Sequence, residues 1–138
     1  PDPRRGRDAV KRGGIINANL AGSIGRLGHT DLVVVSDAGL PIPPGPAVVD
    51  LAFQFGVPAF ETVLSGLLEE LVVESAIAAE EVETRNPRSH ELLETRLPNL
   101  ELIPHEELKR TVTRAKLVVR TGEATPYSNV ILRCGVPF

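Results

Sequence analysis

The sequence predicts an α/β fold, a single three-layer domain with a mainly parallel β-sheet flanked by helices. Apolar β-branched runs such as LVVVS at residues 32–36 are typical of strands that are covered on both faces. These runs alternate with amphipathic stretches such as residues 58–71, and that alternation is typical of a parallel sheet. The chain has 138 residues, which fits one domain. We expect the domain to span residues 11–138, after a flexible extension at residues 1–10.

Six segments are predicted as strands because they are short, apolar and rich in β-branched residues. The loop DAGLPIPPGP separates the first strand from the second, since such a dense run of prolines and glycines cannot continue a regular element. A second loop, TGEATPYSN, separates the last two strands. The predicted strands are residues 32–36, 48–52, 72–79, 100–103, 117–120 and 129–134.

Five helical segments are predicted around these strands. Asn17 can cap the first of them, NANLAGSIGRL, which carries its leucines and an isoleucine on one face. Pro58 fits the first turn of the longest helix, and Asn86-Pro87 is expected to break the charged stretch that follows into two pieces. The predicted helices are residues 17–27, 58–71, 80–85, 89–96 and 104–115.

Composition excludes several classes of partner. Hydrophobic residues make up 42% and charged residues 24%, with a net charge of −3, whereas a nucleic-acid-binding surface is normally basic. No apolar run approaches the roughly 20 residues that span a bilayer, and the basic N-terminus lacks the apolar segment of a secretory signal. The single cysteine, Cys134, cannot form an internal disulfide, which fits a cytoplasmic protein.

The sequence contains none of the motifs that indicate metal or cofactor chemistry. No His, Cys and acidic residues have the spacing of metal ligands, and no HExxH or paired CxxC occurs. Nucleotide-binding glycine motifs and the nucleophile motif GxSxG are also absent. We therefore expect no metal and no cofactor, and acid–base chemistry remains.

The two polar loops hold the first candidate site residues. Ligands in parallel sheets bind outside the carboxyl ends of strands, where SDAGLPIP and TGEATPYSN are expected to lie. Asp37 in the first loop can bind a ligand hydroxyl, and Tyr127, Ser128 and Asn129 in the second place three polar side chains in a row. Turn formation explains these residues equally well, so both interpretations stay open at this point.

Two histidines are candidates for acid–base work, because histidine exchanges protons near neutral pH. His29 lies in LGHTD, directly before the strand at 32–36, and His105 opens the helix PHEEL. From the residues alone, a turn residue is the simpler interpretation of His29 and a first-turn residue that of His105. A third histidine, His90, lies on a charged helix and is expected to be solvated.

Taken together and in order, these motifs resemble the D-ribose pyranase family. The resemblance covers residues 11–138, and the combination of LGHTD, SDAGLPIP and PYSN is its most specific part. The L-fucose mutarotases are similar relatives, but the DAGLPIP loop favours the ribose branch. The matching stretches are KRGGIINANL, LGHTD, SDAGLPIP, VDLAFQFGVP, PHEEL, RTGEATPYSNVIL and GVPF.

The resemblance implies a cofactor-independent isomerase that interconverts β-D-ribopyranose and β-D-ribofuranose and supplies ribokinase. It implies that His29 is the proton donor. Asp37, His105 and the stretch Tyr127-Ser128-Asn129 match substrate-binding positions. It also implies a homodecamer of two stacked pentameric rings, with each site at a subunit boundary.

Other functions remain open beside this one. A mutarotase for another sugar such as L-fucose belongs to the same class of enzyme. A non-catalytic sugar-binding or transport-accessory module would use His29 only as a hydrogen-bond donor, and a purely structural ring-forming protein would bind no sugar at all.

Overall fold

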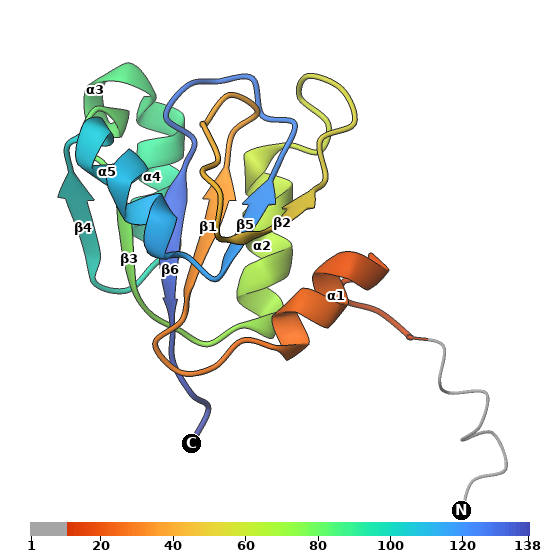
Figure 1. Cartoon of the computed structure of the whole chain (residues 1–138). Coiled ribbons are helices and arrows are strands. Elements are labelled where there is room, and N and C mark those ends of the chain that lie inside the picture. The colour runs from red at the N-terminus through yellow and green to blue at the C-terminus, as the bar shows by residue number, and fades with distance from the viewer. Residues whose placement is uncertain (1–10) are drawn as a thin grey trace, which may run out of the picture.

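The computed structural model describes residues 11–138, so the extension expected at residues 1–10 lies outside the described residues. Within that range the chain forms one six-stranded sheet with helices on both of its faces (Figure 1). The strands are β1 (Leu32–Ser36), β2 (Ala47–Asp50), β3 (Val73–Ala79), β4 (Leu100–Ile103), β5 (Leu117–Arg120) and β6 (Val130–Cys134). The helices are α1 (Ala18–Gly25), α2 (Phe60–Glu70), α3 (Val82–Arg85), α4 (Pro87–Arg96), α5 (His105–Thr111) and the 3₁₀ turn η1 (Val112–Arg114).

The sheet is mainly parallel, as predicted. Its strand order is β2-β5-β1-β6-β3-β4, and β6 alone runs antiparallel to its neighbours β1 and β3 among the described strands. The carboxyl ends of the other strands therefore meet at one edge of the sheet, together with the start of β6. Loops that follow different strands converge at this edge, which is where ligands bind in sheets of this kind.

Two hydrophobic cores, one on each face of the sheet, confirm the predicted three layers. Val33 and Val35 of β1 pack with side chains of α1, α2, α3 and α4, whereas Val34 packs with Leu108 of α5 and Val112 of η1. Successive side chains of a strand point to opposite faces, so the run VVV contributes to both cores. This explains why β1 reads as a continuous apolar run rather than as an alternating one.

Two helices begin at residues other than those predicted, and in each case a capping interaction accounts for the observed start. The helix predicted from Pro58 begins at Phe60, whose N–H donates to the carboxylate of Glu123 at 3.0 Å, since Ala59 offers no capping side chain. The helix predicted from residue 89 begins at Pro87, because Asn86 caps it by accepting the N–H of Ser89. Of the helices within residues 11–138, none is long and apolar enough to cross a membrane.

Candidate active site

A pocket of about 390 Å³ opens at the edge where the parallel strands end. The two polar loops meet there, since the N–H of Ala38 donates to the carbonyl oxygen of Glu123 at 2.8 Å. The start of α5 and the loop between β2 and α2 complete its wall. The pocket brings together four of the six predicted site residues, in a lining made of Asp37, Ala38, Gly39, Leu40, Pro41, Phe55, His105, Glu123, Ala124, Pro126, Tyr127 and Asn129.

Asp37 and Asn129 hold each other in a reciprocal pair of hydrogen bonds. The backbone N–H of Asp37 donates to Asn129 Oδ1 at 2.8 Å, and Asn129 Nδ2 donates to Asp37 Oδ2 at 3.1 Å. Asp37 Oδ1 accepts two further bonds, from the backbone N–H groups of Gly39 and Leu40. A carboxylate has roughly four acceptor positions, so Oδ2 keeps capacity for a ligand hydroxyl.

Burial raises the pKa of the Asp37 carboxyl above its ordinary value. The N–H of Gly39, the amide of Asn129 and the N–H of Leu40 act in the opposite direction, and so does the charge of His105, but burial is the largest effect. The site therefore presents a buried carboxyl that is easier to protonate than one in water. Such a group suits the binding of an uncharged, hydroxyl-rich ligand.

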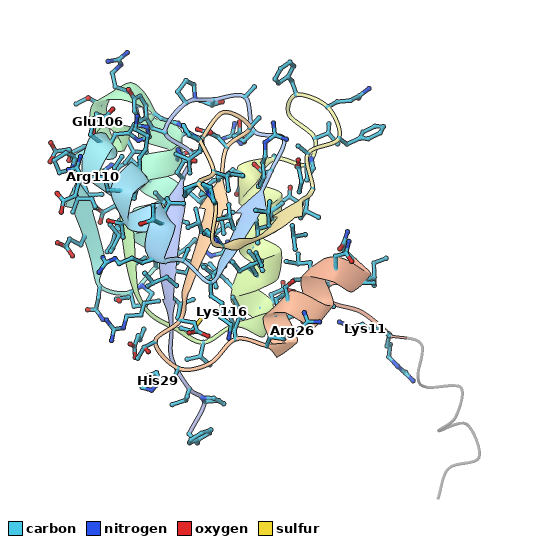
Figure 2. The ribbon with its side chains drawn as sticks, viewed as in Figure 1. Lys11, Arg26, His29, Glu106, Arg110 and Lys116 are labelled. Carbon is cyan, nitrogen blue, oxygen red and sulfur yellow. The ribbon has the colours of Figure 1, made fainter. Side chains whose placement is uncertain are left out.

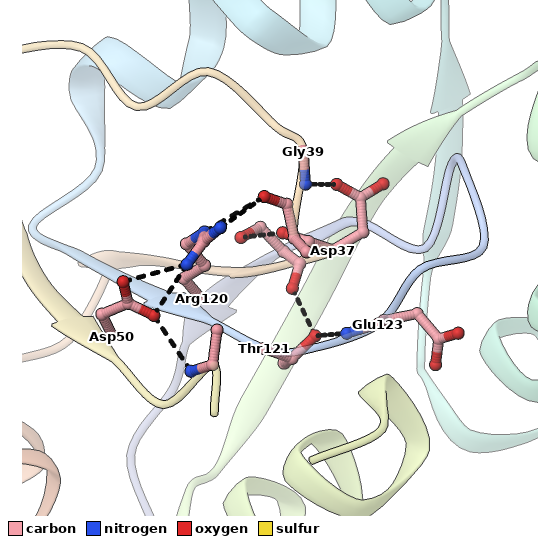
Figure 3. A network of polar contacts seen from close by, with 9 residues as sticks. Asp37, Gly39, Asp50, Arg120, Thr121 and Glu123 are labelled. Atoms are coloured by element: carbon pink, nitrogen blue, oxygen red, sulfur yellow. Dashed lines mark hydrogen bonds and ion pairs between the residues drawn. The ribbon is translucent and has the colours of Figure 1, made fainter. Parts of the chain in front are cut away.

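The loop after β1 is held in place by a network of polar contacts (Figure 3). Arg120 donates from Nε and Nη2 to the carbonyl oxygen of Ala38 at 3.1 and 2.8 Å, and its Nη1 binds both carboxylate oxygens of Asp50. The hydroxyl of Thr121 donates to the carbonyl oxygen of Ser36 at 2.7 Å. The ends of β1, β2 and β5 are thus tied together, which fixes Asp37 relative to the opposite loop.

Tyr127 and His105 form the aromatic side of the pocket. Their rings meet edge to face with centroids 5.1 Å apart, and the guanidinium of Arg85 lies 5.9 Å from the centroid of the tyrosine ring. Tyr127 has a φ of 65°, a left-handed backbone conformation that residues other than glycine adopt only when the surroundings impose it. Nδ1 of His105 is buried and has no hydrogen-bond partner among the described residues, so a bound hydroxyl would satisfy it.

Ser128 lies next to these residues but faces away from the pocket. Its hydroxyl contacts Asn86 Nδ2 and the hydroxyl of Ser89, each at 2.9 Å, at the start of α4. The Asn86 amide also donates to the carbonyl oxygen of Pro126 at 2.8 Å. The predicted hydroxyl contact between Ser128 and a ligand stays a prediction that this arrangement does not favour, because the hydroxyl already holds the turn that carries Tyr127.

His29 lies at the opposite edge of the sheet from the pocket (Figure 2). It precedes β1, whereas Asp37 follows β1, and the strand separates the two. Its Nε2 lies 3.1 Å from Glu74 Oε2, and the other oxygen of Glu74 accepts a hydrogen bond from Arg133 Nε at 2.7 Å. Within one chain the structure therefore does not bring the predicted proton donor to the pocket that holds the other predicted residues.

Comparison with known proteins assigns the chain, including both His29 and the pocket residues, to a family. The model of the RbsD / FucU transport protein family matches residues 10–137. The chain belongs to this family. The resemblance read from LGHTD, SDAGLPIP and PYSN is thereby confirmed.

The chain is similar in sequence to D-ribose pyranases along almost its whole length. The chain is 70% identical to D-ribose pyranase 1 of Rubrobacter xylanophilus over 129 residues, which cover 94% of this chain and 100% of that protein. It is 60% identical to D-ribose pyranase 2 of Streptomyces griseus over 129 residues, with the same coverage.

Solved structures of similar proteins have the same fold. Bacillus subtilis RbsD complexed with D-ribose is 45% identical, with a TM-score of 0.89, and the match covers 93% of this chain and 99% of that one. The fucose mutarotase of Streptococcus pneumoniae, solved with L-fucose, is 18% identical with a TM-score of 0.71, covering 89% of this chain and 95% of that one. The second likeness shows the fold alone.

Three residues that line this pocket or hold its loops were not predicted from the sequence. Glu123 lies in a loop that was singled out for its polarity, and Asn86 was singled out only as a helix break. Arg120 gave no signal, because a charged residue at the end of a strand has many uses. In the part of the chain that the structure describes, no group of three His, Cys, Asp or Glu side chains is placed to hold a metal ion.

Proposed function

We propose that this chain is a D-ribose pyranase, an isomerase that interconverts β-D-ribopyranose and β-D-ribofuranose without a cofactor. The observation that carries the proposal is the pocket that gathers Asp37, His105, Tyr127 and Asn129 at the carboxyl edge of the sheet. The chain has 70% sequence identity with a D-ribose pyranase and 45% with a protein solved in complex with D-ribose, which supports ribose as the sugar.

The reaction needs proton transfers and no change of oxidation state. The anomeric hydroxyl loses a proton and the ring oxygen gains one. The bond between C1 and the ring oxygen breaks, which leaves an open-chain aldehyde. The 4-hydroxyl then attacks C1, loses its proton, and the carbonyl oxygen regains one to give the furanose. A positioned group that exchanges protons near neutral pH contributes roughly 10²–10⁴-fold to such steps.

We assign His29 as the proton donor to the ring oxygen. Asp37 Oδ2, the free N–H of Asn129, Nδ1 of His105 and the Tyr127 side chain would bind the sugar hydroxyls and hold the open chain for reclosure. His105 can also serve as the partner base. Ser128 would contribute through the turn that it holds.

The separation of His29 from the pocket supports a site that two subunits share. In a ring of copies, the edge that carries His29 would face the pocket of the next subunit. Phe55, on the wall of the pocket, is 86% exposed in the single chain, which is the exposure expected of an apolar side chain at an unfilled boundary. We propose a decamer of two pentameric rings, located in the cytoplasm, where it would supply the furanose to ribokinase.

Saturation-transfer NMR on D-ribose, with L-fucose in parallel, tests the activity. We expect a catalytic amount of the protein to accelerate exchange between the β-pyranose and β-furanose anomeric signals of ribose. Acceleration for fucose alone would contradict ribose as the substrate. Saturable ribose binding without acceleration would instead support the sugar-binding module, and the absence of any binding would favour a purely structural role.

Mixed oligomers test the shared site. Chains that carry His29→Ala and chains that carry Asn129→Ala are co-expressed with different tags, and oligomers that contain both are isolated. Because on the order of a quarter of the boundaries would then join two intact halves, we expect exchange to recover to a comparable fraction of wild type. Mixed oligomers as inactive as the two parents, or a protein that stays monomeric, would contradict the shared site.

A further inference from the structure

Glu74 is the extra residue of a β-bulge. Val73 of β3 pairs with Cys134 of β6 and Ser75 pairs with Arg133, so Glu74 has no partner of its own in the ladder. A bulge bends the strand and re-aims the side chain of the extra residue. Here it accompanies a carboxylate that lies between the imidazole of His29 and the guanidinium of Arg133.

Arg133 anchors Glu74 from the side opposite His29. Its Nε donates to Glu74 Oε1 at 2.7 Å, which leaves Oε2 to face His29 Nε2 at 3.1 Å. The backbone carbonyl of Glu74 accepts a further bond from Asn99 Nδ2 at 3.0 Å. The bond to His29, followed by those to Arg133, also lowers the pKa of Glu74 although its burial acts against this, so the group stays a carboxylate at neutral pH.

The turn that carries His29 is equally constrained. The carboxylate of Asp31 accepts the N–H of Gly28 at 2.7 Å and pairs with Lys116 at 3.2 Å. Thr30, which has a φ of 73°, donates its N–H to the carbonyl oxygen of Cys134 at 2.9 Å. With its backbone tied to β6 and its ring tied to Glu74, His29 has a defined orientation.

We propose that Glu74 is a positioning residue for His29, holding the proton of the neutral ring on Nε2 and leaving Nδ1 to exchange protons with the sugar. The second half of this assignment rests on the proposed function. A carboxylate accepts hydrogen bonds and cannot donate them, so it selects the tautomer with hydrogen on the facing nitrogen. Nδ1, which carries no proton in this tautomer, takes the proton that the anomeric hydroxyl loses and gives it to the ring oxygen on opening. On closing it takes the proton of the 4-hydroxyl and gives it to the carbonyl oxygen.

His90 and Glu94 on α4 provide an internal control. Their atoms Nε2 and Oε1 are also 3.1 Å apart, but the pair lies on a helix and contacts neither His29 nor the lining of the pocket. Exposed pairs of this kind contribute little to stability, so neither glutamate is needed for the fold. The variants Glu74→Gln and Glu94→Gln are therefore a matched pair in which only the first should affect His29.

Long-range ¹H–¹⁵N NMR correlations of labelled histidine measure the tautomer directly. We expect the neutral His29 ring of the wild-type protein to carry its proton mainly on Nε2. In Glu74→Gln this preference should be lost, because an amide can both donate and accept, whereas Glu94→Gln should leave His29 unchanged. A wild-type ring with its proton on Nδ1, or the same preference in Glu74→Gln, would overturn the positioning role.

Ribose exchange kinetics test the consequence for the reaction. We expect Glu74→Gln to lower kcat about 10-fold or more, since a misdirected tautomer disables a catalytic histidine, while KM changes by less than about twofold. An unchanged kcat would overturn the catalytic half of the proposal. If the wild-type protein does not accelerate exchange, the proposed function fails, but the tautomer measurement still decides whether Glu74 orients His29.

Discussion

Asn129 shows how one side chain serves both the fold and the site. It is 1% exposed, and its amide binds the backbone N–H and the carboxylate of the same residue, Asp37. These two bonds join the loop after β1 to the start of β6. The pocket keeps its shape because the residues that would contact the sugar also contact one another.

Replacing Asn129 by alanine should weaken ribose binding before it abolishes the fold. The change leaves the buried N–H of Asp37 without a partner, which costs about 1–3 kcal/mol of unfolding free energy. Asn17→Ala is the control, since it removes the cap of α1 and about 1 kcal/mol without touching the pocket. Calorimetric titration with ribose measures the affinity of both, and wild-type affinity in Asn129→Ala would remove Asn129 from the binding site.

At the scale of elements, the loop between β2 and α2 packs directly against the loop after β5. Gly122 donates its N–H to the carbonyl oxygen of Pro58 at 2.9 Å, and its own carbonyl oxygen accepts from Gly56. A Cβ at position 122 would collide with the backbone carbonyls of Gln54 and Val57. The wall of the pocket therefore depends on a position where only glycine fits.

Gly122→Ala should destabilise the protein by roughly 2–4 kcal/mol, because backbone rather than a flexible side chain has to move. Gly25→Ala is the matched control, since nothing lies within 4 Å of a Cβ there and alanine favours the last turn of α1. Urea unfolding of both variants checks this. Equal stability of the two variants would mean that the loops do not pack as described.

The predicted elements agree with the structure most closely where local pattern decides them. The runs that became β1, β4 and β5 were predicted to the residue, because each strand is an apolar stretch bounded by turn residues. The start of α2 was misplaced because its cap comes from Glu123, a contact across 63 positions that no local pattern contains.

The lining of the pocket could be predicted in part for the same reason. Asp37, His105, Tyr127 and Asn129 were expected at the ends of strands, and they share one pocket. His29 and Ser128 were predicted as site residues too, and neither lines the pocket within one chain. His29 precedes a strand and therefore lies at the other edge of the sheet, and both assignments stay predictions. The orientation of Ser128 could not be read from the sequence, because it depends on how α4 packs against the turn at 126–129.

At the scale of the whole molecule, its carboxyl groups set its response to acid. Asp31, Glu74, Glu106 and Glu123 have lowered pKa values, whereas that of Asp37 is raised. A lowered pKa contributes stability above the ordinary value of the group, and this stability is lost as pH falls through the folded-state pKa. Asp37 acts in the opposite sense, since its contribution is present in acid and is lost as pH rises.

Glu123→Gln should reduce the amount by which the unfolding free energy falls in acid. Burial would raise the pKa of Glu123, but hydrogen bonds from Phe60 and Thr125 outweigh it and lower the pKa from its ordinary value. The wild-type protein should therefore lose more unfolding free energy than the variant between about pH 6 and about pH 3. Urea titrations at one fixed protein concentration measure this, and parallel curves would show that Glu123 binds protons equally in the folded and unfolded states.

In the proposed mechanism, His29 of the LGHTD motif gives the proton that opens the ribose ring. Saturation-transfer NMR on D-ribose, comparing the wild-type protein with His29→Ala, tests it most directly. We expect pyranose–furanose exchange to be accelerated by the wild-type protein and to fall by roughly 10²–10⁴-fold in the variant, with ribose binding largely retained. Exchange at the wild-type rate in a folded His29→Ala variant would contradict the claim.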